Sequence, residues 1–234
     1  MKSFVFIIVL FLSATILQAQ DCKGLYYLDN GDIQITFYDK KSDETGKLTY
    51  TMTGVSNAGA TASVNFTSVM VNKKGKILSN GSGIFKCNGG ILYVDAKTAL
   101  PQEQLAAYKD MEIKANDTYI EYPSSMETGQ TLKQVDFTME VYNKGSLFTT
   151  LTFEEINRKV DGKETFTTHA GSWDCWKISY EVKFKVAVPP MNMGVPVTME
   201  CTEWFAPGFG VVKTETYDKE GKMVGFSQIT GVKK

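Results

Sequence analysis

The stretch "THAGSWDCW" at 168–176 carries three side chains that together could do nucleophilic chemistry. His169, the only histidine of the chain, could act as a base, Asp174 could orient it, and Cys175 could supply a thiolate. Gly171 lies between the imidazole and the thiol and predicts a bend that leaves them on different sides. We therefore expect ordinary strand and turn residues here, and we assign no catalytic residue.

The methionines of "PPMNMGVPVTM" are a second group with potential chemistry. Thioethers at the spacing of Met191, Met193 and Met199 can hold Cu(I) in an exported protein. No nearby histidine completes a ligand set, and the same residues also suit an adaptable apolar loop over a pocket mouth or partner surface. We favour the loop, and we expect neither a metal nor a cofactor.

Carboxylates are the third group. Glu154 and Glu155 are adjacent on a predicted strand, so they face opposite sides of a sheet. Asp174, Glu200 and Glu203 are further possible acids, but nothing in the sequence brings any two together. The paired acids of a glycosidase are therefore not predicted.

The N-terminus has the three-part plan of a secretory signal peptide over residues 1–20. Lys2 is followed by the apolar run 4–12 and by small residues up to Ala19, where we expect cleavage. The alternative is a membrane anchor, but the run is shorter than the ~20 residues of a spanning helix. Asp21 precedes Cys22, so we expect no lipidation there. We predict an exported protein, periplasmic or extracellular, with a single β-rich domain over 21–234.

Composition excludes some partners. The formal net charge is −1, and Arg158 is the single arginine among mostly lysine cations. This balance is unlike that of a nucleic-acid-binding domain, and no second apolar stretch of membrane length follows the N-terminal one. We expect neither nucleic-acid binding nor a transmembrane segment after cleavage.

Four cysteines remain in the exported chain: Cys22, Cys87, Cys175 and Cys201. An even count in an exported protein favours disulfides, and four cysteines allow three pairings. We favour Cys22–Cys87, which would tie the terminus to a strand end, and Cys175–Cys201 then follows by elimination. Alternation places Cys201 inward and Cys175 outward, so the second bond needs a bulge, and one or both thiols could remain free.

Strict alternation dominates the rest of the chain. In "WKISYEVKFKVAV" at 176–188 the even-numbered residues are apolar and the odd-numbered ones are mostly polar, which predicts a strand with one wet face. The segments 32–38, 47–53 and 136–142 repeat this pattern. Glycine–lysine turns at 43–47, 71–76, 160–164 and 217–222 predict hairpins.

One segment breaks the alternation. Pro101 suits a first helical turn, and Leu105, Tyr108 and Met111 recur at helical spacing. The sequence therefore predicts a mainly β protein with one short helix at about 101–110.

Long stretches resemble the TapB-like group of exported proteins, a family of unknown function found mainly in the Bacteroidetes. The resemblance is carried by "NRKVDGKETFTTHAGSWDCWKISYEV", "EWFAPGFGVVKTETYDKEGKMVGFSQIT", "YDKK…GKLTYTMTGV" and "FKCNGGILYVDA". It implies no activity. It implies an antiparallel curved sheet forming an open barrel, similar in shape to periplasmic lipoprotein carriers, with the helix against its concave side. His169 stands where the group pattern has proline, which argues against a catalytic imidazole.

We rank three functions. The first is non-enzymatic binding of an apolar ligand, lipid or lipidated partner by the aromatic face of the sheet, with the methionine loop as its rim. The second is an envelope protein that acts through its surface, and the third is a secreted hydrolase. The residues expected to form the pocket or its rim are Trp176, Tyr180, Phe184, Met191, Met193 and Met199.

Overall fold

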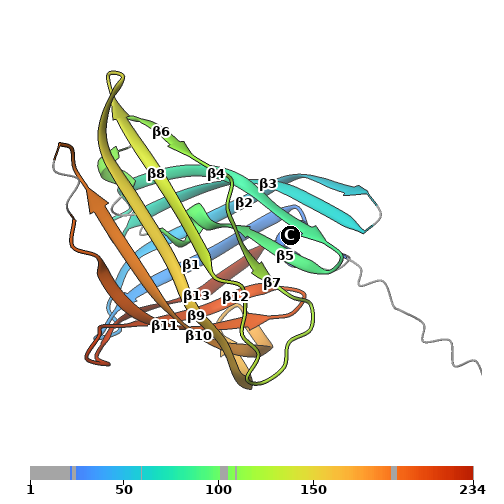
Figure 1. Ribbon diagram of the computed structural model, residues 1–234. Helices are drawn as coiled ribbons and strands as arrows, with labels where there is room; N and C mark the ends of the chain where they lie inside the picture. Colours follow the sequence, from blue (N-terminus) through green and yellow to red (C-terminus); the bar gives the residue numbers. More distant parts are fainter. Residues whose placement is uncertain are drawn as a thin grey trace, which may run out of the picture.

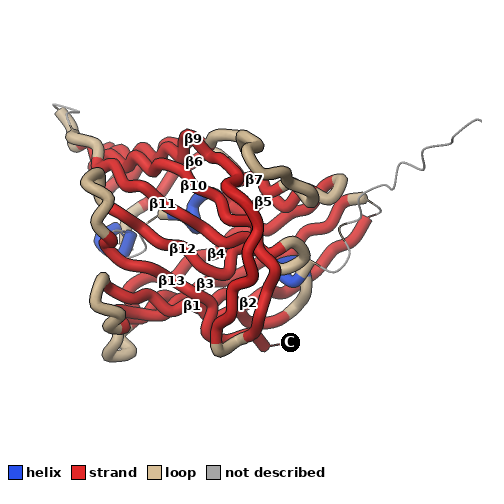
Figure 2. The backbone as a smooth tube through the Cα atoms, turned by 90° about the horizontal axis from the view of Figure 1, so that it is seen from below, coloured by secondary structure: helices blue, strands red, loops and turns tan. Residues whose placement is uncertain are grey.

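The computed structural model describes residues 22, 25–58, 60–100, 105–108, 110–190 and 194–233. Thirteen antiparallel strands form one sheet in the order β6-β8-β9-β10-β11-β12-β13-β1-β2-β3-β4-β5-β7. The sheet curls into an open half-barrel (Figures 1 and 2). The strands are β1 Gly31–Asp39, β2 Glu44–Ala58, β3 Thr61–Asn72, β4 Ile77–Asn88, β5 Ile91–Asp95, β6 Glu112–Ala115, β7 Tyr119–Tyr122, β8 Val135–Asn143, β9 Ser146–Thr168, β10 Gly171–Ala187, β11 Val197–Ala206, β12 Gly210–Tyr217 and β13 Met223–Lys233.

The predicted fold class, mainly β with an antiparallel curved sheet, is confirmed. Alternation is the physical cause, because apolar residues two apart bury one face of each strand. On β8, for example, Val135, Phe137, Met139 and Val141 are buried, and the residues between them are more exposed. Together such faces form one continuous core inside the curl.

Two turn predictions are wrong. The turn predicted at 43–47 lies at 40–43 instead, because residues 44–47 already belong to β2. The tight hairpin predicted at 160–164 does not form, because β9 runs unbroken through these residues, and the additional residue Asp161 is absorbed as a bulge opposite β10. The helix predicted at 101–110 falls largely on residues outside the described part, 101–104 and 109, and the described residues there form a 3-10 turn, η3 Ala106–Tyr108. A second 3-10 turn, η2 Ala96–Ala99, and the following Leu100 lie against the concave side instead.

Antiparallel pairing sends the connections between neighbouring strands to two opposite ends of the sheet. We call one end the hairpin end; it holds the connections at 40–43, 73–76, 144–145, 188–196 and 218–222. We call the other the disulfide end; it holds the connections at 59–60, 89–90, 169–170 and 207–209. The hairpins β10–β11 and β12–β13 reach toward the left of both views (Figures 1 and 2).

The N-terminal segment covers the disulfide end. Cys22 is bonded to Cys87 near the end of β4. The 3-10 turn η1 Tyr26–Leu28 is buried, and the Tyr26 ring stacks on Phe209 at a centroid distance of 4.9 Å. The Tyr26 amide also donates to the carbonyl of Gly208. These contacts tie the terminus to the 207–209 connection.

Candidate functional site

A cavity of about 550 Å³ lies inside the curl. Its wall comes from both halves of the sheet and from the 3-10 turn η2. The wall extends to the hairpin end, where Asp39, Thr45 and Val224 contribute to it. Most of the wall is apolar, including Ile35, Leu48, Phe85, Phe153, Val182 and Ile229. The volume and apolar lining are typical of pockets that bind small molecules, which span about 300–1,000 Å³.

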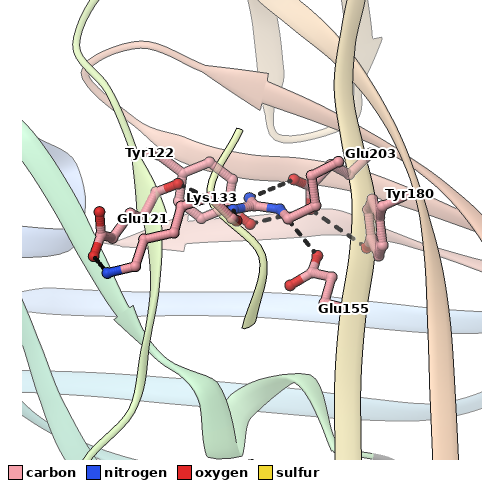
Figure 3. Close-up of polar contacts among 7 residues, drawn as sticks. Glu121, Tyr122, Lys133, Glu155, Tyr180 and Glu203 are labelled. Carbon is pink, nitrogen blue, oxygen red and sulfur yellow. Dashed lines mark hydrogen bonds and ion pairs between the residues drawn. The ribbon is translucent and has the colours of Figure 1, made fainter. Parts of the chain in front are cut away.

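A buried polar cluster lies beside this wall. Glu155 and Arg158 come from β9, Glu203 from β11, Tyr122 from β7 and Tyr180 from β10. The labelled side chains of the two glutamates and two tyrosines converge in Figure 3, and all four contribute to the cavity wall. Buried charges are expensive unless paired, so such a cluster needs a physical account.

Local strand geometry explains why these charges point inward. Leu151, Phe153 and Glu155 share the buried face of β9 by alternation. Asn157 then adopts a left-handed conformation, φ 56°, and the register with β10 shifts at this point. The additional residue reverses the alternation, so Arg158 is buried where period two would expose it.

Arg158 joins the two sides of the curl. Its Nη1 donates to the carbonyl oxygens of Lys133, at 2.9 Å, and Glu121, at 3.3 Å. Glu121 lies on the edge strand β7, whereas the segment around Lys133 runs beside β9. Lys133 Nζ also contacts Glu121 Oε1 at 2.5 Å (Figure 3). The single arginine thus links the edge strand β7 to the segment that runs beside β9. We call this contact between the two sides of the curl the seam.

The electrostatics of the cluster favour a protonated Glu203. Burial raises its pKa to about 8, and the nearby Glu155 carboxylate contributes. Burial also raises the pKa of Glu155, against the opposing effect of Arg158. Glu203 Oε2 accepts from the hydroxyl of Tyr122 at 3.1 Å and from that of Tyr180 at 3.5 Å.

The pairing within the cluster is incomplete. Arg158 Nε lies 3.5 Å from Glu155 Oε1, and Arg158 Nη2 lies 3.8 Å from Glu203 Oε1. Among the described residues, neither nitrogen has a hydrogen-bond partner, and neither do Glu155 Oε2 and Glu203 Oε1. Buried polar atoms are nearly always bonded, so the cluster has capacity for further hydrogen bonds.

A pH dependence of folding follows from the raised pKa of Glu203. Between pH 4.5 and about 8 the folded state keeps a proton that the unfolded state has lost. This contribution to stability is therefore complete below pH 4.5 and falls as the pH rises to 8, by up to about 1.4 kcal/mol per pH unit. The free energy of unfolding, measured in urea at several pH values in this range, should fall less steeply with pH in Glu203→Gln than in the wild type. If both proteins lost stability equally with rising pH, the pH dependence would belong to another group.

The sequence-predicted pocket residues separate into three groups. Tyr180 and Met199 contribute to the cavity wall. Trp176 and Phe184 are buried in the core outside that wall, with the Lys163 ammonium 4.2 Å from the Trp176 ring centroid. Met191 and Met193 lie outside the described residues.

The residues of the opening motif do not form a nucleophilic site in the structure. His169 is exposed in the β9–β10 turn, whereas Cys175 is buried. The Cys175 thiol donates to the Trp173 carbonyl at 3.4 Å, and burial raises its pKa to about 11. A reactive cysteine needs the opposite shift.

The cysteine assignments need one correction. Cys22–Cys87 is present, but Cys175 and Cys201 are free thiols and not a second disulfide. Cys201 pairs with Tyr180, five residues along β10 from Cys175. At about 3.4 Å per residue the two lie roughly 17 Å apart, far beyond disulfide reach. Cys201 contributes to the cavity wall, and burial raises its pKa to about 12, so it is also protonated.

These assignments predict a specific alkylation result. Unfolding the protein in iodoacetamide without reductant should add two carbamidomethyl groups, on Cys175 and Cys201, because only these thiols are free. The native protein should react slowly, since both side chains are buried. Peptide mapping locates the adducts. An unfolded protein that takes up none would have the second disulfide that the structure lacks.

Glu155, Arg158 and Glu203 are the residues that the sequence analysis missed as a unit. A signal was available for the two acids: Glu155 follows Leu151 and Phe153 at period two, and Glu203 follows Cys201 in the same way. A carboxylate in phase with a buried face is a strong sign of a buried charge. Arg158 had no such signal, because its burial depends on the bulge at Asn157.

Comparisons with known proteins agree with the fold. A family model described as DUF3108-like matches residues 30–229. A crystal structure of a protein assigned as exported, with a YmcC-like fold, from Bacteroides fragilis aligns with a TM-score of 0.71 at 20% identity, covering 88% of this chain and 96% of that one. A protein assigned as a lipoprotein from Parabacteroides distasonis aligns with a TM-score of 0.76 at 21% identity, covering 91% and 100%. At these identities the likeness shows the fold alone.

Three further findings complete the comparison. No curated protein matches the sequence. The matched family has a domain-of-unknown-function name, as the resemblance implied, but the narrower TapB-like name is not confirmed. Among the described residues, no helix is long and apolar enough to cross a membrane, and no group of three His, Cys, Asp or Glu side chains could hold a metal ion.

Proposed function

We propose that this chain, which belongs to the DUF3108-like family, is an exported binding protein that holds an apolar ligand, such as a single acyl chain, in its central cavity. One observation carries the proposal: the curled sheet leaves about 550 Å³ of mostly apolar space next to its core. A surface-acting protein has no need of such space, and its interior would ordinarily be close-packed. TapB-like membership and export by an N-terminal signal peptide over 1–20 are part of this proposal.

The buried cluster supports a preference among apolar ligands. Arg158 lies 3.5 Å from Glu155 and 3.8 Å from Glu203, so its charge already faces two buried carboxyl groups, and it does not attract an anion as an unpaired arginine would. A fatty-acid carboxylate would be a third acid beside the one cation and would lose its hydration in a low-dielectric site. A hydroxyl or amide end adds no charge and could bond to the carboxyl groups that Glu155 and Glu203 contribute to the wall. The proposed ligand class is therefore an acyl chain with a neutral polar end.

A hydrolase is the competing hypothesis, because it also needs convergent polar groups with shifted pKa values. Glu203 and Glu155 satisfy that criterion. However, the wall thiol of Cys201 is held protonated, and Arg158 donates to the backbone carbonyls of the seam. These observations favour a structural and ligand-contacting role for the cluster.

Displacement of a fluorescent probe tests the proposal. N-phenyl-1-naphthylamine should bind the protein that begins at Asp21 and brighten, because the cavity is apolar. A monoacylglycerol should displace it more effectively than the fatty acid of the same chain length at neutral pH. A protein that neither binds the probe nor retains any acyl compound would contradict the carrier function. Equal displacement by both compounds would contradict only the neutral-end preference.

A further inference from the structure

Exposed apolar side chains concentrate at the hairpin end. Val195, Val197 and Val188 are 89%, 58% and 52% exposed, and all three lie at the tip of the β10–β11 hairpin. Val224, after the neighbouring 218–222 turn, is 50% exposed, and Ile77, after the 73–76 turn at the same end, is 57% exposed. Single exposed valines are ordinary, but a group at one end of a molecule usually marks an interaction surface.

The same end is strongly basic. Its connections present eight exposed lysines against three acids, Asp43, Asp218 and Glu220, and two further acids, Asp39 and Glu44, flank the 40–43 turn. The connections of the disulfide end contain no lysine and no acid. Among the described connections between neighbouring strands, the excess of lysine therefore lies at the hairpin end. The lysines are Lys40, Lys41, Lys73, Lys74, Lys76, Lys144, Lys219 and Lys222.

The cavity reaches this end as well. Asp39 and Thr45, on either side of the 40–43 turn, contribute to the wall, as does Val224 after the 218–222 turn. The opposite end is covered by the N-terminal segment and its contact with the 207–209 connection. Exposed valines, the lysine-bearing turns and part of the cavity wall therefore lie at one end of the sheet.

We propose that the hairpin end docks on an anionic lipid surface, with the valine tip in the interface and the lysine turns against the headgroups. Apolar side chains flanked by lysines are the chemistry of interfacial binding, because burial of the tip and attraction to anionic lipid act together. This inference rests on the proposed function, since docking at this end would bring the cavity wall at Asp39, Thr45 and Val224 close to the bilayer that supplies or receives the ligand. An acidic protein would satisfy the lysines but offers no reason for the exposed valines.

Vesicle flotation tests the proposal with the ligand-free chain from Asp21 onward, which contains all the described elements. Vesicles of phosphatidylcholine with about a quarter phosphatidylglycerol should bind at least about fivefold more protein than pure phosphatidylcholine vesicles. Raising the salt from about 0.05 to about 0.5 M should reduce the binding, since the headgroup attraction is screened.

Matched variants distinguish an effect of the hairpin end from an effect of the net charge of the protein. Lys74→Glu/Lys219→Glu and, separately, Val195→Ser should each reduce binding to the anionic vesicles at least about threefold. Lys159→Glu/Lys233→Glu changes the net charge equally on exposed lysines away from this end and should leave binding unchanged. All four lysines and Val195 are exposed, so the variants should fold.

Two outcomes would overturn the docking surface. One is equal loss of vesicle binding in the two lysine double variants. The other is no vesicle binding together with retention on an immobilised acidic peptide, which would assign the end to an acidic protein. Probe binding in the cavity is measured without vesicles, so failure of docking with intact probe binding would leave the carrier function standing.

Discussion

Replacing Arg158 with leucine is expected to lower the free energy of unfolding by about 3–5 kcal/mol, because removing one partner of a buried ionic cluster leaves its acids uncompensated. Glu155 and Glu203 would lose their counter-charge in a buried site. The carbonyl oxygens of Glu121 and Lys133 would lose the donor that bridges the seam. Urea unfolding at neutral pH, followed by tryptophan fluorescence, measures the change.

Two further variants make that result specific. Lys159→Leu changes an exposed cation in the next position of β9 and should alter the stability by less than about 0.5 kcal/mol. Adding Glu203→Gln to Arg158→Leu should recover part of the loss, since it removes one buried acid. An Arg158→Leu protein as stable as the Lys159→Leu protein would show that the cluster does not hold the seam.

The second large effect concerns the cavity. Met199→Trp should weaken binding of N-phenyl-1-naphthylamine at least about tenfold, because the indole ring would occupy space that the probe needs. Met199 is in the wall on β11 and only half-buried, so a larger side chain can enter the cavity without displacing the core. A fluorescence titration with the probe gives the dissociation constant.

Thr198→Trp is the matched control. Thr198 precedes Met199 on the same strand, so its side chain points to the opposite face of the sheet. The added ring should leave probe binding unchanged while adding the same fluorophore. If the two variants bound the probe equally well, the binding site would lie outside this cavity.

The class of fold was predictable because it depends on a local signal. The alternation in 176–188 survives in β10, where Ile178, Val182 and Phe184 are buried. Turn positions were harder to predict from the sequence, since Asp161 and Gly162 are residues typical of a tight hairpin turn yet lie within β9. The long pairing of β9 with β10 overrides that local preference.

The site was harder to predict, for two physical reasons. Alternation shows which face of a strand points inward, but not whether that face meets close-packed side chains or a cavity. Tyr180 and Phe184 have the same phase on β10, yet only Tyr180 contributes to the cavity wall. The charged cluster depends on a bulge, and a bulge changes the phase without leaving a recognisable motif. Arg158 therefore looked like a surface cation.

Native mass spectrometry of the exported protein, purified without detergent, tests the central claim most directly. We predict one bound acyl compound per chain that is lost on denaturation, with a fragmentation pattern that shows a neutral polar end. The Met199→Trp protein, purified in the same way, should have the mass of the chain alone, whereas Thr198→Trp should keep the compound. A wild-type protein that has no bound compound and takes up none from added monoacylglycerol would contradict the proposed carrier function.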